Sequence, residues 1–166
     1  VARAAQLPVL EPSDSFEAKE FMKQAFELSE QFDRPFVFRT TTRLAHSQGV
    51  VELEDREEVK DKPYEKDVRR TVMMPANAKL RHIEIEKRNL ELMEAANTLS
   101  VNRVEMNDTK IGVITSGIPY QYVKEALPEA SVLKLGMVNP LPRRLIEDFA
   151  AKVEKLYIIE ELDPVI

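Results

Sequence analysis

The chain has no cysteine in its 166 residues. This absence excludes disulfide bonds, thiolate zinc sites and cysteine-ligated iron–sulfur clusters within the segment. It also has no run near the roughly 18 consecutive apolar residues that a membrane helix needs. Residues 1–5 carry no apolar run typical of a secretory signal. We therefore expect no membrane partner and a cytoplasmic location.

Charge limits the class of partner. Acidic residues outnumber basic ones by 29 to 24, which gives a net charge of −5. Such a chain does not neutralise phosphates in bulk, so nucleic acid is not expected as a partner. The length allows one domain or parts of two, and 43% hydrophobic residues suffice for a core. Because the chain does not begin with methionine, we expect an internal fragment of a larger protein.

The last third predicts a βαβαβ unit in an α/β fold. Residues 111–114, 131–135 and 155–159 are mostly apolar and rich in β-branched side chains, which predicts parallel strands buried on both faces. Helical patterns over 119–127 and 143–153 connect them. In open α/β sheets, ligands and partner domains lie at the carboxyl edge of the strands.

A second βαβ unit is predicted over residues 7–39. Asp14 is a suitable N-cap, and Glu17 follows three residues later as in a capping box. Strands are expected at 7–10 and 36–38, and the helical crossover between them is long enough for a parallel pair.

The middle of the chain differs in composition. Fourteen of the twenty-two residues in 49–70 are charged, which favours a solvated linker or an exposed hairpin, with one possible short strand at 50–53. Residues 76–99 predict a long helix, either bracing two domains, which we favour, or forming a coiled coil. Its expected packing seam consists of Ala78, His82, Ile85, Asn89, Leu92, Ala96 and Leu99.

Polar side chains gather in residues 39–47, directly after the strand at 36–38. An arginine there could form a forked contact with a carboxylate or phosphate, and His46 could transfer a proton near neutral pH. Alternatively, the hydroxyl groups cap turns and His46 is a surface residue. The neighbours His46 and Ser47 do not make a triad, because adjacent side chains point apart and no orienting acid can be assigned.

Three other features have weaker chemical signals. The turn at 115–119 lacks both the G-x-G-x-x-G spacing and a Walker lysine, so a structural turn is favoured over a ligand or partner contact. Glu160 and Glu161 are adjacent on a strand and point to opposite faces, so they do not form an acid/base pair. His82 has only Glu86 nearby, which is not a metal site.

Several strings resemble one known family. They are residues 8–15 (PVLEPSDS) with 17–19, 39–43 (RTTTR) with 46–47, 115–118 (TSGI) with 120–122, 133–136 (LKLG), 140–142 (PLP) and 159–164 (IEELDP). In this order they resemble the alpha subunits of indolepyruvate ferredoxin oxidoreductases, which belong to the thiamine-diphosphate-dependent 2-oxoacid:ferredoxin oxidoreductases. The resemblance runs nearly end to end and is weakest over 54–108.

The resemblance implies oxidative decarboxylation of an aryl 2-oxoacid to an acyl-CoA, with ferredoxin as electron acceptor and a beta subunit as partner. It implies thiamine diphosphate, Mg²⁺ and 4Fe-4S clusters in the full-length enzyme. It also implies that residues 1–48 end a pyrimidine-type thiamine domain, 49–75 are a charged linker, 76–107 hold a connecting helix, and 108–166 belong to an incomplete transketolase C-terminal-like domain.

This chain departs from the family pattern where chemistry is concerned. It has no Gly-Asp-Gly segment for Mg²⁺ and diphosphate and no cysteine for clusters, so we expect no catalytic residue, bound cofactor or metal here, and no activity alone. By analogy with the family, Arg43, with Thr42 and His46, would contact an anionic substrate or coenzyme A group. Ser116, Gly117 and Glu160 would be domain-contact positions.

Two alternatives to an enzyme fragment remain open. One is a non-catalytic binding or assembly module that uses the sheet edge and the helix seam at 78–99. The other is a small-ligand domain in which the turn at 115–119 holds an anion.

Overall fold

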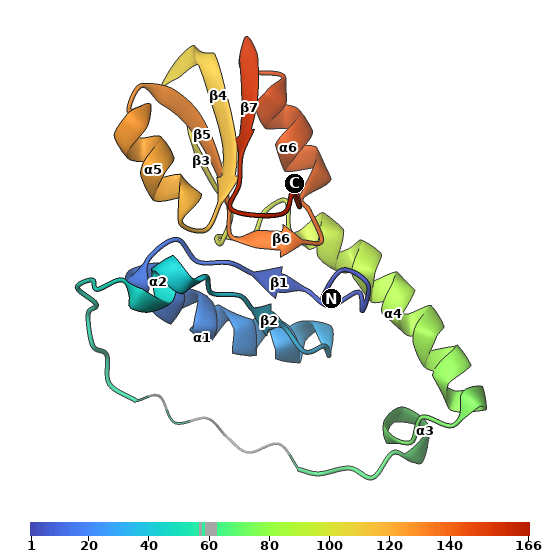
Figure 1. Ribbon diagram of the computed structural model, residues 1–166. Helices are drawn as coiled ribbons and strands as arrows, with labels where there is room; N and C mark the ends of the chain where they lie inside the picture. The colour runs from blue at the N-terminus through green and yellow to red at the C-terminus, as the bar shows by residue number, and fades with distance from the viewer. Residues whose placement is uncertain (57, 59–62) are drawn as a thin grey trace.

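The computed structural model describes residues 1–56, 58 and 63–166. Figure 1 shows two α/β units, one above the other in this view, with the long helix α4 (Pro75–Ala95) running alongside and beyond the lower one. The predicted α/β class with parallel βαβ units is confirmed. Assignment of the upper unit to the transketolase C-terminal-like fold stays a prediction.

The N-terminal unit is the expected βαβ arrangement. Strand β1 (Val9–Leu10) pairs in parallel with β2 (Val37–Phe38), and helix α1 (Ser15–Phe32) connects them. Asp14 accepts a hydrogen bond from the backbone N–H of Glu17, so the predicted N-cap is confirmed. Asp33 ends the helix in the left-handed conformation, with φ of 47°. A short helix, α2 (Thr42–His46), follows β2.

The described residues between α2 and α4 include one short helix and no strand. The strand predicted at residues 50–53 is wrong, because no described neighbouring strand supplies a hydrogen-bonding ladder there. Lys19 Nζ instead donates to the Glu52 carbonyl at 2.6 Å. Helix α3 (Val68–Thr71) precedes α4. Positions 57 and 59–62 of the predicted linker lie outside the described residues.

Helix α4 ends earlier than predicted, because the chain turns after Ala95. The side chain of Asn102 donates to the Ala96 carbonyl at 2.8 Å, and β3 (Arg103–Glu105) follows within the range predicted to be helical or connecting. The predicted seam is confirmed at Leu92 and Ala96, which are fully buried. It is wrong at His82, whose side chain is exposed beside Glu86.

The C-terminal unit holds a four-stranded sheet in the order β3-β5-β4-β7. Strand β4 (Asp108–Ser116) is parallel to β5 (Ala130–Leu135) and β7 (Lys155–Ile159), and β3 is antiparallel to β5. Helices α5 (Pro119–Ala126) and α6 (Arg143–Ala150) make the two crossovers. The predicted βαβαβ unit is confirmed, although β3 was not foreseen.

Burial of β7 on both faces was predicted wrongly. Leu156, Tyr157 and Ile158 are 41–50% exposed, because β7 is an edge strand of the described sheet. An apolar sequence indicates a strand but does not say whether that strand has neighbours on both sides.

Strand β6 (Met137–Asn139) joins the two units. It begins two residues after β5 ends, leaves the C-terminal sheet, and pairs antiparallel with β1 in the order β2-β1-β6. One core cluster contains Val9 of β1, Leu133 and Leu135 of β5, and Phe149 of α6. The two sheets therefore share a buried core. None of the helices in the described ranges is long and apolar enough to cross a membrane.

Candidate functional site at the junction of the two units

The segments 39–47 and 115–122 lie at the same junction, although they are far apart in sequence. Glu11, directly after β1, forms an ion pair with Arg39, directly after β2. Glu11 also lies against Gly117, in the turn after β4. The residues that follow strands in both units therefore meet at one place, as the carboxyl-edge expectation anticipated.

The local geometry at position 117 requires glycine. Its φ is +56°, a left-handed conformation that side chains with a Cβ rarely adopt. A Cβ atom at this position would lie 2.7 Å from the Glu11 Oε1 atom. The turn therefore needs glycine both for its backbone and for the close approach of the carboxylate.

Glu11 is an unusual carboxylate because it is only 4% exposed. Burial raises its pKa above the ordinary value; Arg39 opposes this rise, while Glu161 and Glu160 add to it. One Glu161 carboxylate oxygen is buried with no hydrogen-bond partner among the described residues. Negative charge is therefore concentrated where the two units meet.

A second ion pair lies at the junction, and this one crosses between the two units. Lys134, on β5, is fully buried and contacts the carboxylate of Glu17, on α1. Ser13 donates to that carboxylate through its backbone N–H at 2.8 Å and its hydroxyl at 2.7 Å. Burial alone would raise the pKa of Glu17, but Lys134 and Ser13 outweigh burial and lower it. The Lys134 ammonium also lies 4.6 Å from the centre of the Phe21 ring.

Polar contacts continue along the junction. Arg43 Nη1 donates to the Tyr122 hydroxyl at 3.0 Å, and its guanidinium lies 5.8 Å from the centre of that ring. Gln121 Nε2 donates to Asp14 at 3.1 Å. Helices α2 and α5 are thus linked, and the cap of α1 takes part.

The predicted substrate residues share helix α2. Thr42, Arg43 and His46 are exposed, whereas Leu44 is buried and anchors the helix. Thr42 and His46 are four residues apart, so they lie on one side of α2. Their role in binding stays a prediction.

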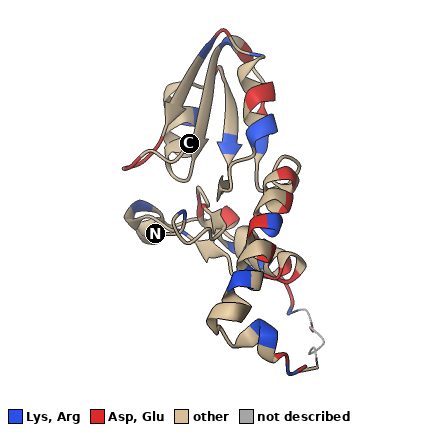
Figure 2. Ribbon diagram, turned by 90° about the vertical axis from the view of Figure 1, so that its right-hand side faces the viewer, with Lys and Arg blue, Asp and Glu red and all other residues tan. Residues whose placement is uncertain are grey.

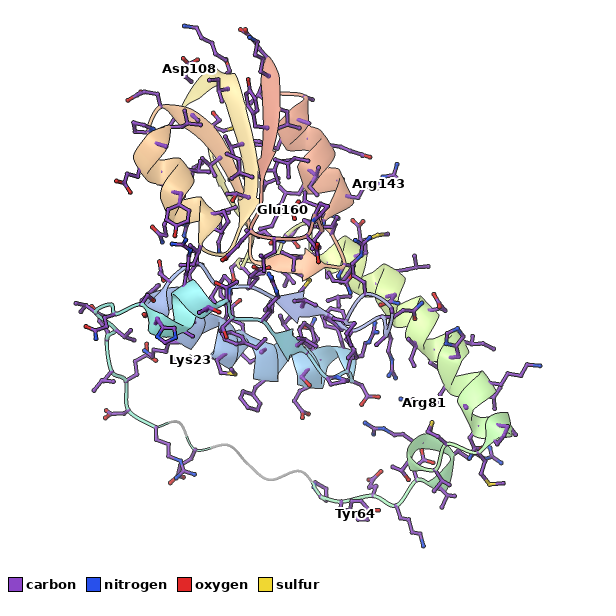
Figure 3. The ribbon with its side chains drawn as sticks, in the orientation of Figure 1. Lys23, Tyr64, Arg81, Asp108, Arg143 and Glu160 are labelled. Atoms are coloured by element: carbon purple, nitrogen blue, oxygen red, sulfur yellow. The ribbon has the colours of Figure 1, made fainter. Side chains whose placement is uncertain are left out.

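The predicted contact residues lie close by. Ser116 is buried at the end of β4. Glu160 follows β7, where Figure 3 shows it near the junction, and it accepts backbone hydrogen bonds from Val165 at 2.8 Å and Ile166 at 3.0 Å. In this structure Glu160 therefore holds the turn that follows its own strand. Whether it also contacts another domain stays a prediction.

Sequence reasoning missed Glu11 and Lys134. Lys134 had a visible signal, since it is the one charged residue inside a mostly apolar predicted strand, 131–135. Such a lysine either reaches solvent at an edge or is paired inside, and β5 is an interior strand. Glu11 had no comparable signal, because a glutamate after a short strand is ordinarily exposed.

A pocket of about 320 Å³ opens beside the junction, with apolar walls that include Val9, Val37 and Val165. Glu11, Arg39 and Arg3 also line it. Its arginines are suited to a carboxylate or a phosphate. The described residues show no group of three or more histidines and carboxylates that could hold a metal ion.

Comparison with known proteins gives consistent names. The chain is 42% identical to the indolepyruvate oxidoreductase subunit IorA of Methanothermobacter thermautotrophicus, over 99% of this chain and 28% of that protein. It is also 42% identical to IorA of Archaeoglobus fulgidus, over 98% of this chain and 27% of that protein, and to IorA of Thermococcus kodakarensis, over 99% and 27%. The chain thus spans less than a third of the length of these curated relatives. No family model matches it.

Among solved structures, similarity is remote. A 2-oxoglutarate:ferredoxin oxidoreductase from Magnetococcus marinus, solved with 2-oxoglutarate, coenzyme A and succinyl-CoA, aligns with 52% of this chain and 16% of its own at 18% identity and a TM-score of 0.37. A likeness of this size carries no argument about the site.

Proposed function

Since the chain is a relative of the IorA subunits of indolepyruvate oxidoreductase along one segment of their length, we propose that it works as part of a 2-oxoacid:ferredoxin oxidoreductase. In that enzyme it organises structure rather than carrying the redox chemistry. It sets the position of the segment 39–47, which contains α2, relative to the turn at 115–117.

The observation that carries this proposal is a pair of charge contacts at the junction, one of which crosses between the units. Glu17 of α1 meets the buried Lys134 of β5, and Glu11 meets Arg39 beside Gly117. Buried charges tolerate little displacement of their partners, because an unpaired one is costly. Two such contacts therefore suit a segment whose task is to hold polar loops in fixed relation.

We further propose an aryl 2-oxoacid of the indolepyruvate type as the substrate, with coenzyme A, ferredoxin and a beta subunit as partners. The name of the relatives supports the substrate class. Arg43 would pair with an anionic group of the substrate or of coenzyme A, and Thr42 and His46 would add polar contacts from the same helix.

The cofactors implied by this family do not fit the residues of this chain. Cluster ligation requires cysteines, and the chain has none. A Gly-Asp-Gly segment for the diphosphate and Mg²⁺ is also missing from its sequence. We therefore propose that thiamine diphosphate, Mg²⁺ and 4Fe-4S clusters are held elsewhere in the assembled enzyme, and we assign no reaction step to this segment.

The proposal is tested on the natural gene product that contains this segment, purified without oxygen together with its beta subunit. We expect near-stoichiometric thiamine diphosphate, several irons and acid-labile sulfides per chain, and 2-oxoacid-dependent reduction of ferredoxin. A product with neither cofactor nor activity would overturn the oxidoreductase assignment. The alternative function, a non-catalytic binding or assembly module, would then be preferred. The exposed apolar side chains of the edge strand β7 are consistent with that function.

In the same enzyme, Arg43→Ala tests the substrate contact. We expect a higher KM for the 2-oxoacid or for coenzyme A. Arg144→Ala is the control, because Arg144 pairs with Glu94, away from the segment 39–47. Unchanged kinetics would remove Arg43 from the proposed site.

A further inference from the structure

Two arginines follow strand β2, and they differ in whether their charge is paired. Arg39 pairs with the buried carboxylate of Glu11. Arg43 has no carboxylate partner within the described ranges, and its guanidinium instead contacts Tyr122. Figure 2 shows charged residues of both signs on both units, so the charge of Arg43 does not belong to a general excess of positive charge. In the segment 39–47, Arg43 is therefore the arginine that is available to an anion.

Tyr122 fixes the guanidinium of Arg43 without neutralising it. Arg43 Nη1 donates to the Tyr122 hydroxyl at 3.0 Å, and the guanidinium carbon lies 5.8 Å from the ring centre, within the range of a cation–π contact. A guanidinium has five N–H donors in a planar fork, so four remain for a ligand. Tyr122 is 47% exposed, so the pair is open to solvent. An arginine held in this way loses less conformational entropy when it binds an anion.

The first turn of α5, which carries Tyr122, is itself anchored on two sides. Tyr120 is buried, and its hydroxyl donates to Glu105 of β3 at 2.8 Å. Gln121 Nε2 donates at 3.1 Å to Asp14, the N-cap of α1. Since both neighbours of this kind bind other elements, Tyr122 offers Arg43 a support whose position is fixed by the rest of the fold.

The proposed reaction offers Arg43 two kinds of anion, the carboxylate of the 2-oxoacid and the phosphates of coenzyme A. The carboxylate leaves as carbon dioxide, so its negative charge diminishes on the way to the transition state. An arginine paired with it would stabilise the bound substrate more than the transition state and would slow the reaction. A phosphate keeps its charge throughout, so an arginine bound to it aids binding without opposing the chemistry.

The exposure of α2 also favours a phosphate. A reacting carboxylate has to lie at the reacting centre, from which water is excluded. Thr42, Arg43 and His46 are all exposed. The phosphates of coenzyme A lie far from its reacting thiol, so they can be bound on an open surface. The planar fork of an arginine matches a phosphate group, and the hydroxyl of Thr42 and the ring of His46 can add hydrogen bonds.

We propose that Arg43 binds a phosphate of coenzyme A rather than the carboxylate of the 2-oxoacid, and that Tyr122 is the positioning residue that holds Arg43 for this contact. This assignment rests on the proposed function, because it names which of the two substrates Arg43 meets.

The first test measures KM separately for coenzyme A and for the 2-oxoacid, in the natural enzyme purified with its beta subunit. With Arg43→Ala, a charge-assisted contact is lost, so we expect KM for coenzyme A to rise about tenfold or more. KM for the 2-oxoacid and kcat should stay near their wild-type values, and Arg144→Ala should change none of the three. A raised KM for the 2-oxoacid, or an unchanged KM for coenzyme A, would overturn the phosphate contact.

The second test concerns Tyr122. Tyr122→Phe removes the hydroxyl and keeps the ring, whereas Tyr122→Ala removes both. We expect KM for coenzyme A to rise about threefold in Y122F and further in Y122A, with KM for the 2-oxoacid unchanged. Tyr64→Ala is the control, since Tyr64 is 84% exposed and Figure 3 shows it far from the junction. A folded Y122A enzyme with the wild-type KM for coenzyme A would rule out the positioning role.

A double variant separates positioning from a general structural effect. If Tyr122 acts through Arg43, the enzyme with both Arg43→Ala and Tyr122→Ala should have the same KM for coenzyme A as the enzyme with Arg43→Ala alone. A double variant with a much higher KM than either single variant would show that Tyr122 acts independently of Arg43, against the proposal.

Loss of the phosphate contact and loss of the proposed function give different results. A wild-type enzyme that does not reduce ferredoxin with a 2-oxoacid would remove the proposed function, and the phosphate contact with it. An active wild-type enzyme in which Arg43→Ala raises KM for the 2-oxoacid would keep the proposed function and reject the phosphate contact alone.

Discussion

The two ion pairs at the junction use the same chemistry in different surroundings. Lys134 and Glu17 are both buried, and Ser13 adds two hydrogen bonds to the carboxylate. Arg39 is 37% exposed and reaches a pocket, while its partner Glu11 is buried. Contacts lower the pKa of Glu17, whereas burial prevails and raises that of Glu11.

The comparison shows that burial alone does not decide the direction in which the pKa of a carboxylate is shifted. Glu17 has enough donors to stay ionised, so its pair acts as a fixed connection between α1 and β5. Glu11 is paired with Arg39, which is partly exposed to solvent, and two acidic neighbours outweigh the weaker influence of Lys134. We therefore expect the first pair to bear on stability, and the second to respond to ligands and protons.

Breaking the buried pair should have the largest effect. Lys134→Met leaves the Glu17 carboxylate buried without its cation, which we expect to destabilise the fold by about 3–5 kcal/mol. The measurement is urea unfolding followed by circular dichroism. Lys110→Met is the control, because the Lys110 side chain is 76% exposed, and its effect should be small.

If the single variant does not fold, Lys134→Met combined with Glu17→Met gives the answer. The double variant replaces both charges by apolar groups and should recover much of the loss. A single variant as stable as the wild type would show that the pair does not hold the two units together.

Adding a side chain at Gly117, beside the Glu11–Arg39 pair, should have an intermediate effect on stability. Gly117→Ala forces a Cβ into a left-handed backbone position 2.7 Å from the Glu11 carboxylate, so we expect a loss of about 1–3 kcal/mol. Gly49→Ala is the matched control. Its φ is not positive, and its nearest neighbour would be Ser15 Oγ at 3.2 Å. Equal melting temperatures for both variants would contradict the close approach at Gly117.

Sequence patterns predicted the helices and most strands better than they predicted which strands pair with each other. The βαβ units, the Asp14 cap and the long helix follow from local periodicity, which the chain carries in each segment. Strand β6 is only three residues long, and it forms because β1 lies beside it, so no local pattern reveals it. The exposure of β7 likewise depends on strand order rather than on its own residues.

The candidate site was predictable in part for the same reason. The segments 39–47 and 115–117 could be proposed because both directly follow predicted strands. That Glu11 would lie between them could not, since its burial results from the contact of two units. The link between Arg43 and Tyr122 is also a tertiary contact that no spacing encodes.

The smallest expected effect is the response of the two carboxylates to pH. The folded-state pKa of Glu17 is lowered, so Glu17 contributes stability above its ordinary value of 4.5, and this contribution is lost as the pH falls through the folded-state pKa. The folded-state pKa of Glu11 is raised, so its contribution to stability is complete below pH 4.5 and is lost as the pH rises through the folded-state pKa.

The two contributions can be separated by measuring the unfolding free energies of wild type, Glu17→Gln and Glu11→Gln from about pH 4 to about pH 7. The advantage of wild type over E17Q should grow with pH, and its advantage over E11Q should shrink. If the wild-type advantage changed with pH in the same direction for both variants, the pKa values of the two carboxylates would be shifted in the same direction. That result would contradict the contrast between the two ion pairs.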